Sequence, residues 1–427
     1  MDLIQIKGGN FLDGEITISG SKNASLPMII ASLLTKEKIQ IRNIPNLSDV
    51  STLLKLIKTL GSEFELKNED NSSYKLIIQT KDIKNNIASY DLVRKMRASF
   101  WVLAPLILRH GEAKVSLPGG CAIGIRPINF YLSILEKMGA TIKIKDGYVQ
   151  ALVKSNLRPI DHKLAFPSVG VTHFFLMISS LIEGESIIRN AAMEPEIISL
   201  ANMLNKMGAK ITGHGTNQII INGCSKLKGA DITIPPDRIE AGTFAIAVAT
   251  TGGKLKLKSI NIKEIETLKN VLQNTGVEIK SSENFIEIIK KNREIHPTDI
   301  ETKPYPGFPT DLQAQFMALM AYSNGRSKIK ETIVENRFMH VQELVRLGAK
   351  MEPNSDTAIV NGVKKLYGAP LMATDLRASA SLIIGALRAE GTSTIRRVYH
   401  LDRGFDKIEK KLSSCGAIIE RKRDKDE

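Results

Sequence analysis

One stretch of the sequence, VSLPGGCAIGIRP (residues 115–127), sets a cysteine among glycines and places an arginine five residues after it. Glycines around Cys121 let backbone N–H groups turn toward whatever occupies the loop. Arg126 can favour the thiolate of Cys121 and hold an anion beside it. This pattern favours a reactive thiol, and the alternative is a small residue in a glycine turn. The other two cysteines show no such surroundings: Cys415 lies on an apolar helix, and Cys224, in INGCSKLKG, has no charged or glycine-rich cradle.

A second candidate site is ISGSKNASLP (residues 18–27), where a strand turns into an apolar helix. Lys22 and Asn23 at this turn can present a cation and amide groups to an anion. The alternative is a helix start capped by Ser21, with an exposed lysine. The segment lacks the G-x-x-x-x-G-K-[ST] spacing of a phosphate loop, so nucleoside triphosphate chemistry is not indicated.

Charged residues also mark other junctions in the chain. Asp311 stands immediately before a helix in FPTDLQAQF (residues 308–316). An aspartate there is more often a helix N-cap than a catalytic base. Any one arginine at such a junction can be a solvated charge, but several beside helix starts are typical of phosphate or carboxylate recognition. The arginines in question are Arg97, Arg337, Arg377 and Arg403.

These residues must be positioned by a repeated framework. A helix ending in glycine and followed by an alternating strand recurs six times, as in LLKLIKTLGSEFEL and YLSILEKMGATIKI. The glycine supplies the left-handed residue at which a helix can end and a strand begin. The marker glycines are separated by 78, 69, 68, 72 and 68 residues, and they are Gly61, Gly139, Gly208, Gly276, Gly348 and Gly416.

A second phrase recurs in the same rhythm, in which an apolar helix passes through a turn into another strand, as in LILRHGEAKVSL and SLIEGESII. Alternating helices and strands predict an α/β architecture with helices packed on sheets. Six units of about 70 residues divide most simply into two domains of three, with a boundary near DITIPPDRIEAG. A solenoid is the alternative arrangement. Two similar domains would form a cleft between them, which is a common location for ligands.

Composition narrows the function classes. The 427 residues carry a formal charge of +14, which fits an anionic substrate, a nucleic acid or a membrane surface. Aromatic residues make up 5% of the chain with one Trp, which disfavours nucleic acid. The seven histidines show no metal-binding spacing, so no metal site is predicted. Three scattered cysteines, no apparent signal peptide and no run of 18 apolar residues predict a cytoplasmic protein without membrane insertion.

Taken in order, SGSKNASLP, KMRAS, LPGGCAIGIRP, PSVGVT, FPTDLQAQF, ENRFMH, TDLRASAS and YHLDRGF closely resemble the UDP-N-acetylglucosamine 1-carboxyvinyltransferase family of enolpyruvyl transferases. The resemblance covers essentially the whole chain. It implies a two-domain inside-out α/β barrel, with helices inside and sheets outside, in which each domain holds three βαβαββ-type repeats. The first domain would span residues 22–235 and carry the Cys121 loop. The second would combine residues 1–21 with 236–427, because the first 21 or so residues pack with the second domain in that family.

The reaction implied by the resemblance moves the enolpyruvyl group of phosphoenolpyruvate to the 3′-hydroxyl of UDP-N-acetylglucosamine, with release of phosphate and no cofactor. Carbon 3 must accept a proton, and the family's cysteine, here Cys121, is the general acid. The sugar hydroxyl must lose a proton, and the family's aspartate is Asp311. Cations must bind phosphoenolpyruvate and stabilise the tetrahedral intermediate. By resemblance the residues that bind phosphoenolpyruvate are Lys22, Asn23, Arg97, Arg126, Arg377 and Arg403, of which Lys22 and Arg403 are also catalytic.

The resemblance also implies a covalent phosphoenolpyruvate adduct at Cys121 and inhibition by the epoxide fosfomycin. The expected role is peptidoglycan precursor synthesis, and with it cell wall biogenesis, cell shape and cell division. Two departures concern the nucleotide: many relatives carry lysine where Phe166 stands, and Asn129 replaces an acid found in some. The UDP-sugar contacts by resemblance are Asn23, Arg97, Arg126, Pro127, Ile128, Asn129, Phe130, Ser168, Val169, Gly170, Asp311, Ile333 and Arg337.

Two alternatives remain open. The enzyme 5-enolpyruvylshikimate-3-phosphate synthase resembles this family in fold and in transferred group, but it lacks the PGGC loop. A catalytically idle paralogue or a basic binding protein belongs to a different class of function. The sequence does not determine the oligomeric state.

Overall fold

The computed structural model of the chain describes residues 2–69, 73–118 and 128–424. Within these residues the chain folds as two compact units. The first unit comprises residues 20–118 and 128–235, and the second comprises residues 2–19 and 236–424. The predicted boundaries, after residues 21 and 235, lie within two residues of these.

Among the described residues, each unit carries three sheets of four strands. In the first unit the strand orders are β14 (Asp231–Thr233), β3 (Ile39–Pro45), β5 (Ser73–Gln79), β4 (Glu63–Asn68); β6 (Ile87–Ala88), β7 (Glu112–Ser116), β9 (Tyr148–Leu152), β8 (Thr141–Lys145); and β10 (Asp161–Lys163), β11 (Gly184–Arg189), β13 (Gln218–Gly223), β12 (Lys210–Thr212). In the second unit they are β2 (Leu12–Thr17), β15 (Gly253–Lys258), β17 (Phe285–Lys290), β16 (Glu278–Ser282); β18 (Ile300–Glu301), β19 (Arg326–Lys330), β21 (Thr357–Asn361), β20 (Lys350–Asn354); and β22 (Pro370–Met372), β23 (Thr392–Arg396), β1 (Asp2–Lys7), β24 (Ile418–Arg423).

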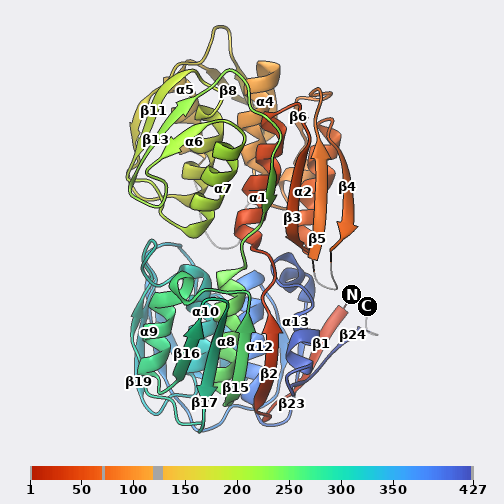
Figure 1. Ribbon diagram of the computed structural model, residues 1–427. Helices are drawn as coiled ribbons and strands as arrows, with labels where there is room; N and C mark the ends of the chain where they lie inside the picture. The colour runs from red at the N-terminus through yellow and green to blue at the C-terminus, as the bar shows by residue number, and fades with distance from the viewer. Residues whose placement is uncertain (1, 70–72, 119–127, 425–427) are drawn as a thin grey trace. The chain divides into compact units, whose positions relative to one another are not determined.

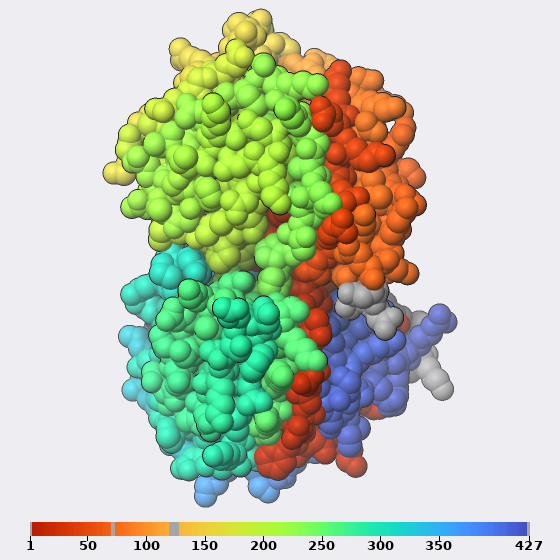
Figure 2. All heavy atoms as spheres, in the orientation of Figure 1, coloured from red at the N-terminus to blue at the C-terminus, as the bar shows by residue number. Residues whose placement is uncertain are grey.

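The repeats have the predicted βαβαββ order, which the second repeat shows directly as β6, α4, β7, α5, β8 and β9. The first, fourth and last repeats are completed by strands from elsewhere in the sequence. β14 supplies the parallel edge strand of the first repeat, β2 does so for the fourth, and β1 closes the last sheet between β23 and β24. The N-terminal residues therefore belong to the second unit because their backbone completes two of its sheets. In the space-filling view the red residues of β2 run beside the green residues of β15 (Figure 2).

Each unit has its own apolar core, made by helices that lie inside the sheets (Figure 1). The inner helices are buried almost all round; every residue of α8, for example, is buried. The strands alternate between buried and more exposed residues, as in β17, so one face of each covers the helices. The inner helices are α1 (Lys22–Ala31), α4 (Leu103–His110) and α6 (Val169–Ser179) in the first unit, and α8 (Arg238–Thr251), α10 (Gln313–Met320) and α12 (Leu376–Arg388) in the second.

A second set of six helices is amphipathic, and each of them leads into a strand through a marker glycine. They are α2 (Ser48–Thr59), α5 (Asn129–Met138), α7 (Pro195–Lys206), α9 (Glu266–Asn274), α11 (Val341–Arg346) and α13 (Ile408–Ser413). All six marker glycines have positive φ, from 85° at Gly276 to 115° at Gly61. This confirms the predicted helix-to-strand passage, because L-residues with a side chain rarely adopt that backbone conformation.

A buried polar cluster fixes the chain where it leaves the second unit. Glu240 Oε2 accepts a hydrogen bond from Ser19 N at 2.6 Å, and Glu240 Oε1 lies 2.8 Å from Lys411 Nζ. Lys411 also donates to Ser19 Oγ at 2.6 Å. Burial raises the pKa of Glu240, and the neighbouring ammonium opposes that rise. The segment that leads to Lys22 therefore starts from a fixed point.

Candidate functional site

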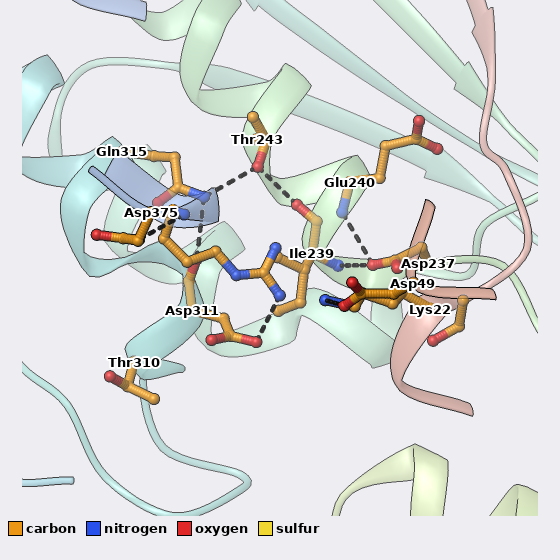
Figure 3. Close-up of polar contacts among 12 residues, drawn as sticks. Lys22, Asp49, Asp237, Ile239, Glu240, Thr243, Thr310, Asp311, Gln315 and Asp375 are labelled. Atoms are coloured by element: carbon orange, nitrogen blue, oxygen red, sulfur yellow. Dashed lines mark hydrogen bonds and ion pairs between the residues drawn. The ribbon is translucent and has the colours of Figure 1, made fainter. Parts of the chain in front are cut away.

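Lys22 is the first residue of α1, and its ammonium has a buried carboxylate partner. The side chain of Ser21 caps the helix by accepting from Ala24 N at 3.3 Å, as the alternative interpretation of this segment expected. Lys22 Nζ lies 2.8 Å from Asp49 Oδ2 in the first turn of α2 (Figure 3). The exposed fractions of the two side chains are 12% and 5%, so the alternative of an exposed lysine is wrong. Asn23 follows Lys22 and is half-buried.

Arg97 begins the short helix η2 (Arg97–Val102), which packs against α1. The preceding Met96 is extended, so the chain enters η2 from a strand-like conformation at the position of the arginine. Arg97 is half-buried. The first unit thus brings two of its predicted phosphoenolpyruvate ligands, Lys22 and Arg97, onto neighbouring elements. Helix starts of this kind suit anions because their N–H groups and dipole favour negative charge.

Apart from Asn23 and Arg97, the predicted UDP-sugar residues of this unit that the structure describes lie at the starts of two adjacent helices, α5 and α6. Ile128 is the N-cap residue of α5, and Ser168 caps α6 by accepting from Val171 N at 3.5 Å. A Cβ added to Gly170 would lie 2.5 Å from Tyr131 Oη, so the two helix starts approach closely only because residue 170 is glycine. The remaining members of this set are Asn129, Phe130 and Val169.

An aromatic pair lies beside these residues. Phe130 packs edge-on against Phe166 with ring centroids 5.2 Å apart. Phe166 is 52% exposed, so it presents an apolar ring beside the start of α5.

In the second unit, Asp311 is held by two arginines. Arg337 Nη2 lies 3.1 Å from Asp311 Oδ1, and Arg377 Nη2 lies 2.6 Å from Asp311 Oδ2. The arginine side chains are 5% and 9% exposed, and the aspartate side chain is 27% exposed. The N-cap interpretation of Asp311 is therefore wrong: it lies within η4 (Thr310–Leu312), whose N-cap is Pro309, and its carboxylate binds guanidinium groups.

The backbone of Asp311 is fixed by residues that sequence reasoning missed. Gln315 Nε2 donates to Asp311 O at 2.9 Å and to Thr243 Oγ1 at 3.2 Å, which joins α10 to α8 (Figure 3). Asp375 caps α12 by accepting from the N–H groups of Arg377 and Ala378, which places Arg377 at the helix start. The glutamines in the otherwise apolar run LQAQFMALM were the available signal, because a buried amide needs partners.

The other predicted residues of the second unit lie near this cluster in the fold. Arg403 ends η5 (Val398–Arg403), which packs against α12. Ile333 is 44% exposed in the loop between β19 and α11 that also carries Arg337. The predicted residues Cys121, Arg126 and Pro127 lie outside the described residues.

The buried histidines and the two cysteines of the described residues have the surroundings of structural residues. Burial lowers the pKa of His173 and of His340 to about 4, so both are neutral near pH 7. Burial raises the pKa of the Cys415 thiol, as an unreactive core cysteine requires, and Cys224 is half-buried. Searched over the described residues, the structure holds no group of three or more His, Cys, Asp or Glu side chains that could bind a metal ion. No helix among those residues is long and apolar enough to cross a membrane.

Comparison with known proteins agrees with this geometry. Residues 6–412 match the family model of EPSP synthase (3-phosphoshikimate 1-carboxyvinyltransferase). The chain is 51% identical to UDP-N-acetylglucosamine 1-carboxyvinyltransferase 1 of Mesorhizobium japonicum, with 99% of each chain covered. It is 52% identical to the UDP-N-acetylglucosamine 1-carboxyvinyltransferase of Chelativorans sp., again over 99% of both.

Solved structures share the fold. The enolpyruvyl transferase NikO from Streptomyces tendae superposes with a TM-score of 0.89 at 23% identity, covering 98% of each chain. An EPSP synthase from Acinetobacter baumannii superposes with a TM-score of 0.75 at 19% identity, covering 99% of this chain and 100% of that one. The predicted enolpyruvyl transferase fold is thereby confirmed.

Proposed function

This chain belongs to the UDP-N-acetylglucosamine 1-carboxyvinyltransferase family, and from that membership we propose its reaction. It transfers the enolpyruvyl group of phosphoenolpyruvate to the 3′-hydroxyl of UDP-N-acetylglucosamine and releases phosphate, in the synthesis of peptidoglycan precursors. The observation that carries the proposal is identity of about half over 99% of both chains to relatives of that one name. Cell wall biogenesis, cell shape and cell division follow from this role.

The second unit supplies the base in this proposal. Asp311 accepts the proton of the sugar 3′-hydroxyl as the oxygen adds to carbon 2 of phosphoenolpyruvate. Support comes from the two arginines at its carboxylate, which favour its ionised, proton-accepting form. Arg377 and Arg403 bind phosphoenolpyruvate, while Arg337 and Ile333 contact the UDP-sugar.

The first unit supplies cations and the sugar-nucleotide contacts. Lys22, Asn23 and Arg97, together with Arg126, neutralise the phosphate and carboxylate of phosphoenolpyruvate and stabilise the tetrahedral intermediate. The helix starts that carry Asn129 and Ser168 bind the UDP-sugar, and their neutral N–H groups suit its diphosphate.

Cys121 is the general acid, which protonates carbon 3 while the oxygen bond forms at carbon 2. Collapse of the intermediate then removes a proton from carbon 3 and expels phosphate from carbon 2. The same thiol adds to carbon 2 of phosphoenolpyruvate, with its proton going to carbon 3, to give a covalent adduct. It is also the target of fosfomycin, whose epoxide the thiolate opens. The compartment we propose is the cytoplasm, where free thiols such as Cys224 and Cys415 persist.

The test is phosphate release from phosphoenolpyruvate with each of two acceptors, UDP-N-acetylglucosamine and shikimate 3-phosphate. We expect release that requires both phosphoenolpyruvate and the UDP-sugar. Release with shikimate 3-phosphate instead would support the second candidate, an EPSP synthase activity, which the matching family model favours. Release with neither acceptor would leave a catalytically idle relative.

A further inference from the structure

Glu331 is a buried carboxylate that the proposed reaction does not use. It is 4% exposed and directly follows β19, at the start of the loop that carries Ile333 and Arg337. A carboxylate of this kind is costly to bury unless several donors satisfy its oxygens. Its partners therefore show what the residue organises.

One oxygen of Glu331 closes the start of its own loop. Oε1 accepts from Ile333 N at 2.9 Å and from Val334 N at 3.0 Å. The same oxygen accepts from Thr302 Oγ1 at 2.9 Å, which comes from the segment after β18. Thr332 strengthens this junction, because its N–H donates to Thr302 Oγ1 at 2.9 Å and its hydroxyl donates to Thr302 O at 2.5 Å.

The other oxygen reaches the residue before Asp311. Glu331 Oε2 accepts from Thr310 Oγ1 at 2.9 Å. Thr310 and Asp311 stand together at the start of the α10 segment (Figure 3). Glu331 thus ties the turn that carries the candidate base to the loop that carries a substrate-binding arginine.

Arg337, at the other end of the loop, also contacts Thr310 and Asp311. Arg337 Nη2 donates to Asp311 Oδ1 at 3.1 Å and lies 3.4 Å from Thr310 O. From the two ends of one loop, Glu331 therefore holds the side chain of Thr310, and Arg337 contacts both Thr310 and Asp311. A shift of the loop moves Asp311 and Arg337 together.

We propose that Glu331 is a positioning residue for the transfer reaction: it sets the carboxylate of Asp311 and the guanidinium of Arg337 relative to the acceptor sugar without touching substrate. The inference rests on the proposed function, since it assigns Glu331 a task in that reaction. Misplacing a reacting group by about 1 Å can cost about 10²-fold in rate, so the task is measurable.

The first test compares Glu331→Ala and Glu331→Gln with wild type. Glu331→Ala removes all four accepted hydrogen bonds, and we expect kcat to fall about 10²-fold and the KM for UDP-N-acetylglucosamine to rise. Glu331→Gln keeps an oxygen for the three Oε1 donors, and the Thr310 hydroxyl can accept from the new amide. We expect it to restore activity to within about 10-fold of wild type, the scale of one altered hydrogen bond.

Thr310→Val isolates the connection to Asp311 and serves if Glu331→Ala does not fold. It removes the hydroxyl that reaches Oε2 and keeps the β-branched shape. We expect about a 10-fold lower kcat with an unchanged KM for phosphoenolpyruvate. The matched control is Glu301→Ala. Glu301 precedes Thr302, and its carboxylate pairs with Lys303 and Lys330 at the surface.

The outcomes separate the two proposals. Thr310→Val with wild-type kinetics, or a folded Glu331→Ala that behaves like Glu301→Ala, overturns the positioning role. A wild-type protein that releases no phosphate with UDP-N-acetylglucosamine overturns the proposed function instead. Calorimetric binding of UDP-N-acetylglucosamine, which needs no chemistry, shows in either case whether the loop still holds its substrate residues.

Discussion

Arg377 Nη2 lies 2.6 Å from Asp311 Oδ2, and this contact joins the proposed base to a proposed ligand of phosphoenolpyruvate. Arg337 holds the other oxygen, so two arginines that we propose as substrate ligands share one carboxylate. Guanidinium groups favour the ionised carboxylate but also weaken it as a proton acceptor. Substrate anions that draw the arginines toward themselves would relieve that restraint.

Asp311→Asn tests the role of the base. The amide has the same shape but cannot take up a proton, so we expect kcat to fall by about 10²- to 10⁴-fold. Steady-state phosphate release measures the change. Thermal unfolding is the control, since the amide oxygen can still accept from one of the two arginines and the second unit should remain folded. A kcat within a few-fold of wild type would show that another group takes the proton.

Asp49→Asn tests the partner of Lys22. The buried carboxylate lies 2.8 Å from the ammonium, and removing its charge weakens the ion pair that orients Lys22. We expect the KM for phosphoenolpyruvate to rise about 10-fold, with a smaller effect on the KM for the UDP-sugar. The matched control is Asp91→Asn, whose side chain is 84% exposed beside Arg94. Equal kinetics for the two variants would exclude a role for Asp49 in holding Lys22.

Local sequence signals predicted the framework well. The six marker glycines have left-handed backbone, Ser21 caps α1, and helices and strands alternate as the two recurring phrases indicated. These features depend on neighbouring residues, and so they can be read from short patterns. Local patterns do not predict the composition of the last sheet, because its strand β1 comes from the other end of the chain.

The residues that position the site were the ones missed. Asp49 looks in the sequence like an ordinary acidic residue in the first turn of a helix, and only the fold brings it to Lys22, 27 residues earlier. The resemblance names Asp311 as the base, but locally it looks like an N-cap, and its partners lie 26 and 66 residues away. Such pairings are set by tertiary packing, within one repeat for Lys22 and Asp49 and between two repeats for Asp311 and Arg377, and local propensity carries no information on it.

Cys121→Asp tests the general acid. A carboxylic acid can deliver the proton but cannot open the epoxide as a thiolate does. We expect catalysis to persist with its pH optimum moved toward acid, because a carboxyl group loses its proton at lower pH than a thiol. Fosfomycin inhibition should disappear. In mass spectrometry of protein treated with fosfomycin and UDP-N-acetylglucosamine, the wild-type peptide that contains Cys121 should carry the modification and the corresponding peptide of the variant should not. Cys224→Ser is the control and should still be labelled at residue 121.

Loss of all activity in Cys121→Asp would mean that sulfur chemistry, such as the covalent adduct, is obligatory for turnover. Labelling of a peptide other than that of Cys121 in the wild-type protein would contradict the assignment of the reactive thiol itself.

Acid should destabilise the protein through its buried histidines. Burial lowers the pKa of His173 in the folded chain from 6.5 to about 4. Between these values the unfolded state binds more protons than the folded state, so stability rises with pH across this window and is lost as the pH falls from 6.5 toward 4. The loss is roughly 3 kcal/mol for such a residue, and His340 in the second unit adds a similar effect.

His173→Phe isolates this contribution. The ring can keep the edge-on contact with Trp101, at 5.3 Å between centroids, but it cannot be protonated. We expect urea-unfolding free energies measured at pH 5 and pH 7 to differ less in this variant than in wild type. His110→Phe, at an exposed position at the end of α4, should keep the wild-type difference. If His173→Phe also kept the wild-type difference between pH 5 and pH 7, the acid sensitivity would have to arise from carboxylates paired in the folded state. The imidazole of His173 would then be charged before the protein unfolds.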